Sequence, residues 1–296
     1  MLKKHILILF GILLTISMAT TCRGAEQSTL DQIRERGVLR HIGVPYANFI
    51  TTDQKGLSIL LIKEFAVHLG VEYEYIQSDW ANVISDLVGY KVTHAEKKVI
   101  LGKKRPIKGD LIANGLTILD WRKKIIDFST PTFPTQVWLA CKSDHRLRPV
   151  QAGKNETETI KYTKSLIKGL HLLGAKNTCL DPSLYGLEQA GAIIHNFQGN
   201  LNELAPAVIK GSAEATLLDV PDALVALQKW PGQIKIIGPV SPRQNMGVAF
   251  RPDSRELLDE FNKFYSKIRN NGIYSKMVKK YYHSVFNYYP RFFSYQ

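Results

Sequence analysis

The chain has 296 residues, 45% of them hydrophobic, so it can bury a large core as one domain or two smaller lobes, and global disorder is excluded. Its formal net charge is +13, with the basic excess concentrated in the first residues, in residues 91–108 and near the C-terminus. Aromatic residues do not alternate with these cations as in RNA-binding proteins, so we expect no nucleic-acid partner and interpret the charge as a solvated basic surface, suited to anionic lipid headgroups.

The first 24 residues are typical of a secretory signal peptide. Two lysines precede an apolar run from Ile6 to Leu14, and small residues follow. The run is too short to span a membrane comfortably. Cleavage after Ala19 and lipoprotein processing at Cys22 both remain open, and the second would make Cys22 a lipid anchor. We therefore expect export to the periplasm or the cell envelope.

The first half of the chain follows an α/β pattern. Apolar residues recur at helical spacing from Leu57 to Leu69, Gly70 follows where a helix C-cap belongs, and strand-like segments flank this helix, which makes a β-α-β unit. The predicted elements are a helix over 30–36, strands over 38–44 and 71–76, a helix over 80–88 capped by Asp79, and a strand over 110–113.

The pattern restarts at Gly169 and predicts a second α/β lobe. Its expected elements are strands over 170–173, 192–196, 215–218 and 234–237, with helices that begin at Pro182, Asn202 and Pro221. Near the C-terminus we predict a strand over 246–250, which pairs with strands of the first lobe, and helices over 254–268 and 273–282.

A lysine-rich segment, residues 89–108, interrupts the first lobe. Its apolar run Val99 to Leu101 and the Gly102-Lys103 pair that follows favour a projecting hairpin. This hairpin is either a solvated insertion or a surface that binds a partner.

Motifs of catalysis and metal binding are missing from the sequence. The eight histidines are scattered, and no Gly-x-Ser-x-Gly, Gly-x-Gly-x-x-Gly or phosphate-loop pattern occurs. Cys141 and Cys179 fit neither a redox motif nor a zinc ribbon, and they are either two separate core thiols or one disulfide. We expect no catalytic residue, no metal and no cofactor.

The segment from Gly109 to Ser129 closely resembles a signature of the bacterial extracellular solute-binding proteins of family 3, in its Arg122 to Phe128 part above all. The resemblance extends over nearly the whole chain after the leader. It is strongest for a subgroup named after the ligand-binding half of membrane-bound lytic transglycosylases, whose muramidase half has no counterpart here. Two departures leave the ligand open, since a common Thr-Pro-Glu-Arg reads Leu119-Asp120-Trp121-Arg122 and a frequent acidic residue is replaced by Leu57-Ser58.

The resemblance implies an α/β fold of the type II periplasmic-binding-protein kind, in which a two-segment hinge joins two α/β lobes. On this basis the signal peptide covers residues 1–24. The first lobe covers residues 25–138 and 243–296, and the second covers 139–242. The crossings are expected near 133–142 and 237–247.

The resemblance also implies a binding site between the lobes. Arg122 matches the arginine that grips a ligand α-carboxylate, for which a planar guanidinium offers two parallel hydrogen bonds. Thr117 and Asn114 match positions that help to hold this carboxylate, and Gly115 lets the main chain approach closely. Asp219 ends an apolar strand and matches the acidic residue that receives the ligand ammonium.

Four further positions match the family site. Thr178 matches a second-lobe threonine at a helix start, where free backbone N–H groups meet an anion. Tyr46, Phe49 and Trp80 occupy positions where the family places aromatic walls. Structural alternatives are a surface ion pair for the arginine, ordinary turn chemistry for Asn114 and Thr117, a helix cap for the aspartate, and plain core packing for the aromatic residues.

The implied function is closure around an amino acid or a related zwitterion, for uptake by an inner-membrane ABC permease. One alternative is an orphan sensor or cell-wall-associated binding module. Another is a cleft enzyme such as a dehydratase, with Asp120, Asp219 or Glu188 as general acid.

Overall fold

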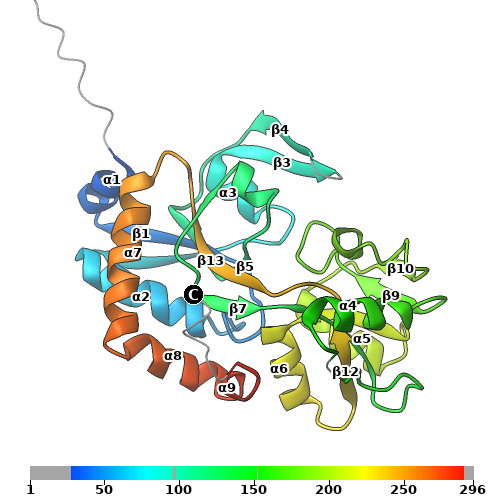
Figure 1. The fold of residues 1–296 in the computed structure, drawn as a ribbon. Coiled ribbons are helices and arrows are strands. Elements are labelled where there is room, and N and C mark those ends of the chain that lie inside the picture. The colour runs from blue at the N-terminus through cyan, green and yellow to red at the C-terminus, as the bar shows by residue number, and fades with distance from the viewer. Residues whose placement is uncertain (1–27, 96–97, 152, 290–296) are drawn as a thin grey trace, which may run out of the picture.

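A computed structural model describes residues 28–95, 98–151 and 153–289, which form two lobes side by side (Figure 1). The predicted signal peptide and Cys22 lie outside the described residues. Across the described ranges, no helix is long and apolar enough to cross a membrane.

The first lobe is a sheet flanked by helices. Its strands are β1 (Val38–Gly43), β2 (Glu72–Gln77), β5 (Leu111–Thr117), β6 (Asp127–Phe128), β7 (Phe133–Thr135) and β13 (Gln244–Phe250). Its helices are α1 (Thr29–Arg36), α2 (Leu57–Leu69), α3 (Val83–Val88), α7 (Arg255–Asn270), α8 (Ile273–Tyr282) and α9 (Val285–Tyr288). The strand order is β2-β1-β5-β13-β6, and β7 also pairs with β13. The parallel pairing of β1 with β2 confirms the β-α-β unit, and β13 pairs with this lobe as predicted.

The second lobe is built from the middle of the chain. Its strands are β8 (Val137–Lys142), β9 (His171–Gly174), β10 (Ile193–Asn196), β11 (Ala215–Asp219) and β12 (Ile234–Pro239), in the order β10-β9-β11-β8-β12. Its helices are α4 (Glu156–Ser165), α5 (Leu204–Ile209) and α6 (Val220–Lys229), with short 3₁₀ turns η2 (Pro182–Tyr185) and η3 (Leu201–Glu203). The chain changes sheets between β7 and β8 and again between β12 and β13, within both expected crossings (Figure 1). The lobe limits at 138 and 242 stay predictions.

Two predicted helix starts were wrong, and one helix was missed. The helix expected over 80–88 begins at Val83, and Asp79 instead accepts from the N–H groups of Ala81 and Asn82 in the turn before it. The helix predicted from Pro182 is a single 3₁₀ turn, because Gly186 takes a left-handed conformation and its N–H caps the carbonyls of Pro182 and Ser183. Helix α4 was not anticipated, because Thr163 is its one buried residue and it has no apolar stripe to reveal it.

The lysine-rich segment forms the predicted hairpin, with antiparallel strands β3 (Tyr90–Ala95) and β4 (Lys98–Lys104). The hairpin projects from the first lobe at the top of Figure 1. Ile100 and Leu101 are more than half exposed, at 55% and 54%, so this element contributes little to the core.

An aromatic cluster fixes the loop after β1 against β5. The Phe49 ring lies 5.2 Å from the rings of both Phe133 and Tyr282, measured between centroids. Gly115 on β5 has φ +73°, and a Cβ there would stand 2.4 Å from the Phe49 ring. This position therefore needs glycine for its backbone angle and for the ring that covers it.

We expect Gly115→Ala to lower the free energy of unfolding by about 2–4 kcal/mol, because left-handed strain and overpacking against Phe49 add together. Gly211→Ala is the matched control, since Gly211 has φ +85° with open space around it and should lose only about 1 kcal/mol. Urea denaturation of both variants measures the difference, and equal losses would show that the ring contact is unimportant.

Candidate functional site

Arg122 is a buried cation. It begins a 3₁₀ turn (Arg122–Lys124) shortly after β5, and its side chain is 1% exposed. Its Nη1 donates to the carbonyl of Thr117 at 2.8 Å, whereas Nε has no hydrogen-bond partner and no carboxylate of the described residues pairs with it. Burial lowers its pKa to about 10, so the guanidinium remains charged at neutral pH. A desolvated charge of this kind needs an anionic partner.

Two neighbours on β5 present further polar atoms. Asn114 is fully buried, and neither its amide oxygen nor its amide nitrogen has a partner among the residues described. The Thr117 hydroxyl is likewise buried, and its polar neighbour in the described structure is the Cys179 thiol. Because a buried polar group left unpaired costs about 1–3 kcal/mol, β5 presents a set of donors and acceptors suited to a polar ligand.

Asp219 brings a carboxylate from the second lobe. It ends β11, is fully buried, and caps α6 by accepting from the N–H of Asp222 at 3.3 Å. The same carboxylate oxygen accepts from the Tyr46 hydroxyl of the first lobe at 2.5 Å. Burial raises the pKa of Asp219 to about 6, which these hydrogen bonds oppose. The residue therefore caps a helix and also faces the other lobe.

Cys179 lies between the two charged groups. Its thiol is 3.5 Å from the second carboxylate oxygen of Asp219, and its pKa is raised to about 12 by burial and by Asp219, while Arg122 opposes this shift. The Tyr185 hydroxyl donates to the Cys179 carbonyl at 2.5 Å. Cys141 and Cys179 are separate buried thiols, which leaves no disulfide between them. Sequence reasoning missed Cys179 and Tyr185 as site residues, although Cys179 directly follows Thr178.

The remaining predicted residues lie in three places: a turn of the second lobe, the surroundings of the Asp219 carboxylate, and the aromatic cluster of the first lobe. The Thr178 hydroxyl donates to the Ala175 carbonyl at 2.7 Å and accepts from the Leu180 N–H at 3.0 Å, so it holds a local turn. The Trp80 ring meets Tyr46 edge-on at 5.5 Å, beside the carboxylate. Phe49 and Gly115 pack against each other in the aromatic cluster of the first lobe.

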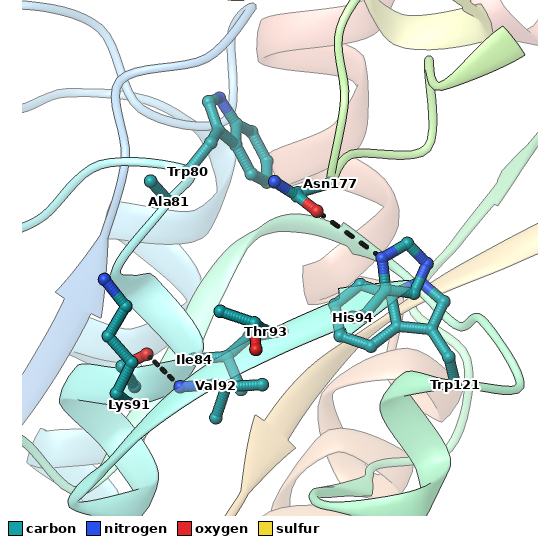
Figure 2. Close-up of a pocket in the computed structure, with 10 residues that line it drawn as sticks. Trp80, Ala81, Ile84, Lys91, Val92, Thr93, His94, Trp121 and Asn177 are labelled. Carbon is teal, nitrogen blue, oxygen red and sulfur yellow. Dashed lines mark hydrogen bonds between the residues drawn. The ribbon is translucent and has the colours of Figure 1, made fainter. Parts of the chain in front are cut away.

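Two of the clefts between the lobes are lined by Trp80, and neither Arg122 nor Asp219 lines them. One, of about 630 Å³, is lined by Pro45 and Trp80 of the first lobe and by Thr178 of the second. The other, of about 340 Å³, lies under the hairpin (Figure 2). There His94 Nδ1 is 3.4 Å from Asn177 Oδ1, a contact that joins the lobes.

Metal binding and general acid catalysis have few candidate residues among those described. In the part of the chain that is described, no group of three or more His, Cys, Asp or Glu side chains could hold a metal ion. Asp120 and Glu188, two of the carboxylates considered as general acids, are exposed, and Asp219 is the buried one of the three.

Comparisons with known proteins show the family of the chain. The family model described as bacterial extracellular solute-binding proteins, family 3, matches residues 41–284. The chain is 25% identical over 290 residues to a membrane-bound lytic murein transglycosylase F of Desulfosudis oleivorans, covering 96% of this chain and 57% of that relative, so it spans little more than half of it. It is 24% identical over 266 residues to the L-cystine-binding protein TcyJ of Escherichia coli K12, covering 87% of each.

A solved structure shows the same fold. The ancestral amino-acid-binding protein AncCDT-1, described as a precursor of cyclohexadienyl dehydratase, has a TM-score of 0.67 and 25% identity, covering 86% of this chain and 100% of that one. The predicted type II periplasmic-binding-protein fold is thus confirmed.

We expect Asp219→Asn to raise the free energy of unfolding at pH 8 and to leave it nearly unchanged at pH 4. The pKa of Asp219 is raised from 3.8 to about 6, so the stability that its carboxyl contributes is full below pH 3.8 and is lost as the pH rises through about 6. This rise in pKa corresponds to about 3 kcal/mol of folding stability. Denaturation without added solute at both pH values measures it, and a similar loss of stability at both would contradict the assignment.

Proposed function

The chain belongs to the bacterial extracellular solute-binding proteins of family 3, and we propose that it binds an amino acid or a related zwitterion between its two lobes. The observation that carries the proposal is the buried guanidinium of Arg122, whose Nε has no partner in the described structure. A ligand α-carboxylate would supply the missing anion through charge-assisted hydrogen bonds. The names of the cystine-binding relative and of the ancestral amino-acid-binding structure support this ligand class.

The carboxylate end of the ligand is assigned to the first lobe. Arg122 would bind both carboxylate oxygens, with the Asn114 amide and the Thr117 hydroxyl completing the shell, since their polar atoms are buried and the amide is unpaired among the described residues. Gly115 would keep β5 in the conformation that presents these side chains. Thr178 would act through the backbone turn that its hydroxyl stabilises.

The ammonium end of the ligand is assigned to Asp219. When ionised, this carboxylate can accept from a ligand ammonium and from the Tyr46 hydroxyl together, because it offers two oxygens. Tyr46 and Trp80 would form the adjoining wall, with Phe49 supporting β5 from behind. The cleft would then bind the zwitterion by complementary charge at both ends.

Binding and closure are coupled in this proposal. Cross-lobe hydrogen bonds already join Tyr46 to Asp219 and the Ala47 N–H to the Asn202 side chain, at 2.5 and 2.8 Å. A ligand that contacts Arg122 on one lobe and Asp219 on the other gains its full set of contacts only when the lobes are together, so it shifts the population toward the closed form. The protein would act as an exported binding protein, not an enzyme, that presents its closed shape to an ABC permease.

A second candidate role is a cell-envelope module that binds peptidoglycan fragments. It is favoured by the match to the lytic transglycosylase, which extends over 96% of this chain. A thermal-shift screen of amino acids beside muropeptide fragments separates the two roles, since uptake of free amino acids requires that these alone raise the melting temperature.

We expect Arg122→Met to weaken amino-acid binding by at least about 30-fold, which corresponds to about 2 kcal/mol, while the fold is kept because methionine retains most of the side-chain volume. Lys123→Ala is the matched control, because Lys123 shares the turn but its side chain is 55% exposed. Calorimetric titration measures both, and an unchanged affinity in Arg122→Met would overturn the carboxylate assignment.

We also expect the affinity for an amino acid to fall about tenfold between pH 7 and pH 5. The pKa of Asp219 is about 6, so the protonated carboxyl, which does not attract an ammonium, predominates at pH 5. Asp219→Asn should bind more weakly and lose this pH dependence, and a keto-acid analogue without the amine should lack it in the wild-type protein. A pH dependence that persists in Asp219→Asn would assign it to another group.

A further inference from the structure

The cleft under the β3–β4 hairpin shares two walls with the proposed amino-acid site. Trp80 lines this cleft and contacts Tyr46, which donates to Asp219. Trp121 also lines it, and its ring lies 5.2 Å from the guanidinium carbon of Arg122. A ligand held by both charged groups would therefore have its side chain next to this cleft, whose volume of about 340 Å³ is that of a small-molecule pocket.

The charge of the cleft is positive. Its lining includes Lys91 and His94 and, among the residues described, no Asp or Glu. Figure 2 shows Lys91 on the side opposite His94 and Trp121, so an occupant would lie between them. A positive lining of this kind attracts anions and repels cations.

Two of the lining residues carry a hydrogen-bond donor that has no partner among the described residues. The indole N–H groups of Trp80 and Trp121 are both buried, and neither has an acceptor within the described structure. Indole nitrogen only donates, so each of these groups requires an oxygen or another acceptor. A ligand group rich in oxygen would meet that requirement, and an ammonium or guanidinium would not.

Cation–π attraction to the tryptophans does not reverse this preference. Such a contact contributes about 0.5–2 kcal/mol when a ring face is free. The Trp121 ring already contacts the Arg122 guanidinium and lies 4.4 Å from the His94 ring, centroid to centroid. Trp80 meets Tyr46 edge-on and keeps a free ring face, so a ligand cation there would gain at most this one contact against repulsion by Lys91.

We infer that this cleft receives the side chain of the bound amino acid and selects one that carries a carboxylate or another anionic oxygen group over one that carries a cation. The inference rests on the proposed function, because it takes Arg122 and Asp219 as the anchors of the amino-acid backbone. It adds the chemical class of the side chain and names Lys91 as the residue that sets it.

Calorimetric titration of the whole protein with L-glutamate, L-glutamine and L-lysine tests the inference. We expect glutamate to bind at least about tenfold more tightly than lysine, with glutamine between them. Lys91→Glu should reverse this order, and Lys91→Met should bring glutamate and glutamine to similar affinities. Lys91 is exposed, so neither variant removes core packing.

Lys103→Glu is the matched control, because it changes the same charge on the same hairpin at an exposed position outside the cleft lining and should keep the wild-type order. Tightest binding of lysine by the wild-type protein, or an order that Lys91→Glu leaves unchanged, would overturn the inference while the proposed function stands. If none of the three amino acids binds, the result contradicts both the inference and the proposed function.

Discussion

The buried guanidinium of Arg122 constrains the rest of the site. Its charge persists in the interior, and none of the described carboxylates neutralises it. Moving an unpaired charge out of water is expensive, so the fold must offset this cost elsewhere, through the packing of two lobes around it. The unpaired amide of Asn114 adds to the same cost. The proposed zwitterionic ligand would remove these costs at once, and this would favour the closed form on binding.

Ionised Asp219 lowers the stability of the folded protein, and the proposed recognition of an ammonium requires this ionised form. A neutral residue would cap α6 and accept from Tyr46 without the penalty of ionisation in a buried position. The carboxylate has the advantage only when a cation lies beside it. The Cys179 thiol lies 3.5 Å from an Asp219 carboxylate oxygen, and its pKa is raised to about 12, so it remains neutral in this environment.

The hairpin contributes the positive charge of Lys91 to the cleft that it covers. A two-stranded insertion of this kind is marginal by itself, and here His94 ties it to Trp121 on its own lobe and to Asn177 on the other. Lys91 of the hairpin therefore belongs to the cleft as well as to the surface. A family fold can take a new ligand class through such an insertion without changes at the two anchors of the amino-acid backbone.

The sequence alone determined the elements whose signal is local. Helical spacing from Leu57 to Leu69, capping at Gly70 and the glycine-containing hairpin segment depend on neighbours in the chain, and each element formed where expected. The family signature around Arg122 also singled out this arginine as a candidate site residue, because its residue pattern is contiguous. Only the tertiary structure decided that Tyr46 reaches Asp219 across 173 positions, that Cys179 lies between the charges, and that Phe49 supports β5. Periodicity specifies which face of an element is buried, whereas the partner that meets this face depends on how the two sheets pack.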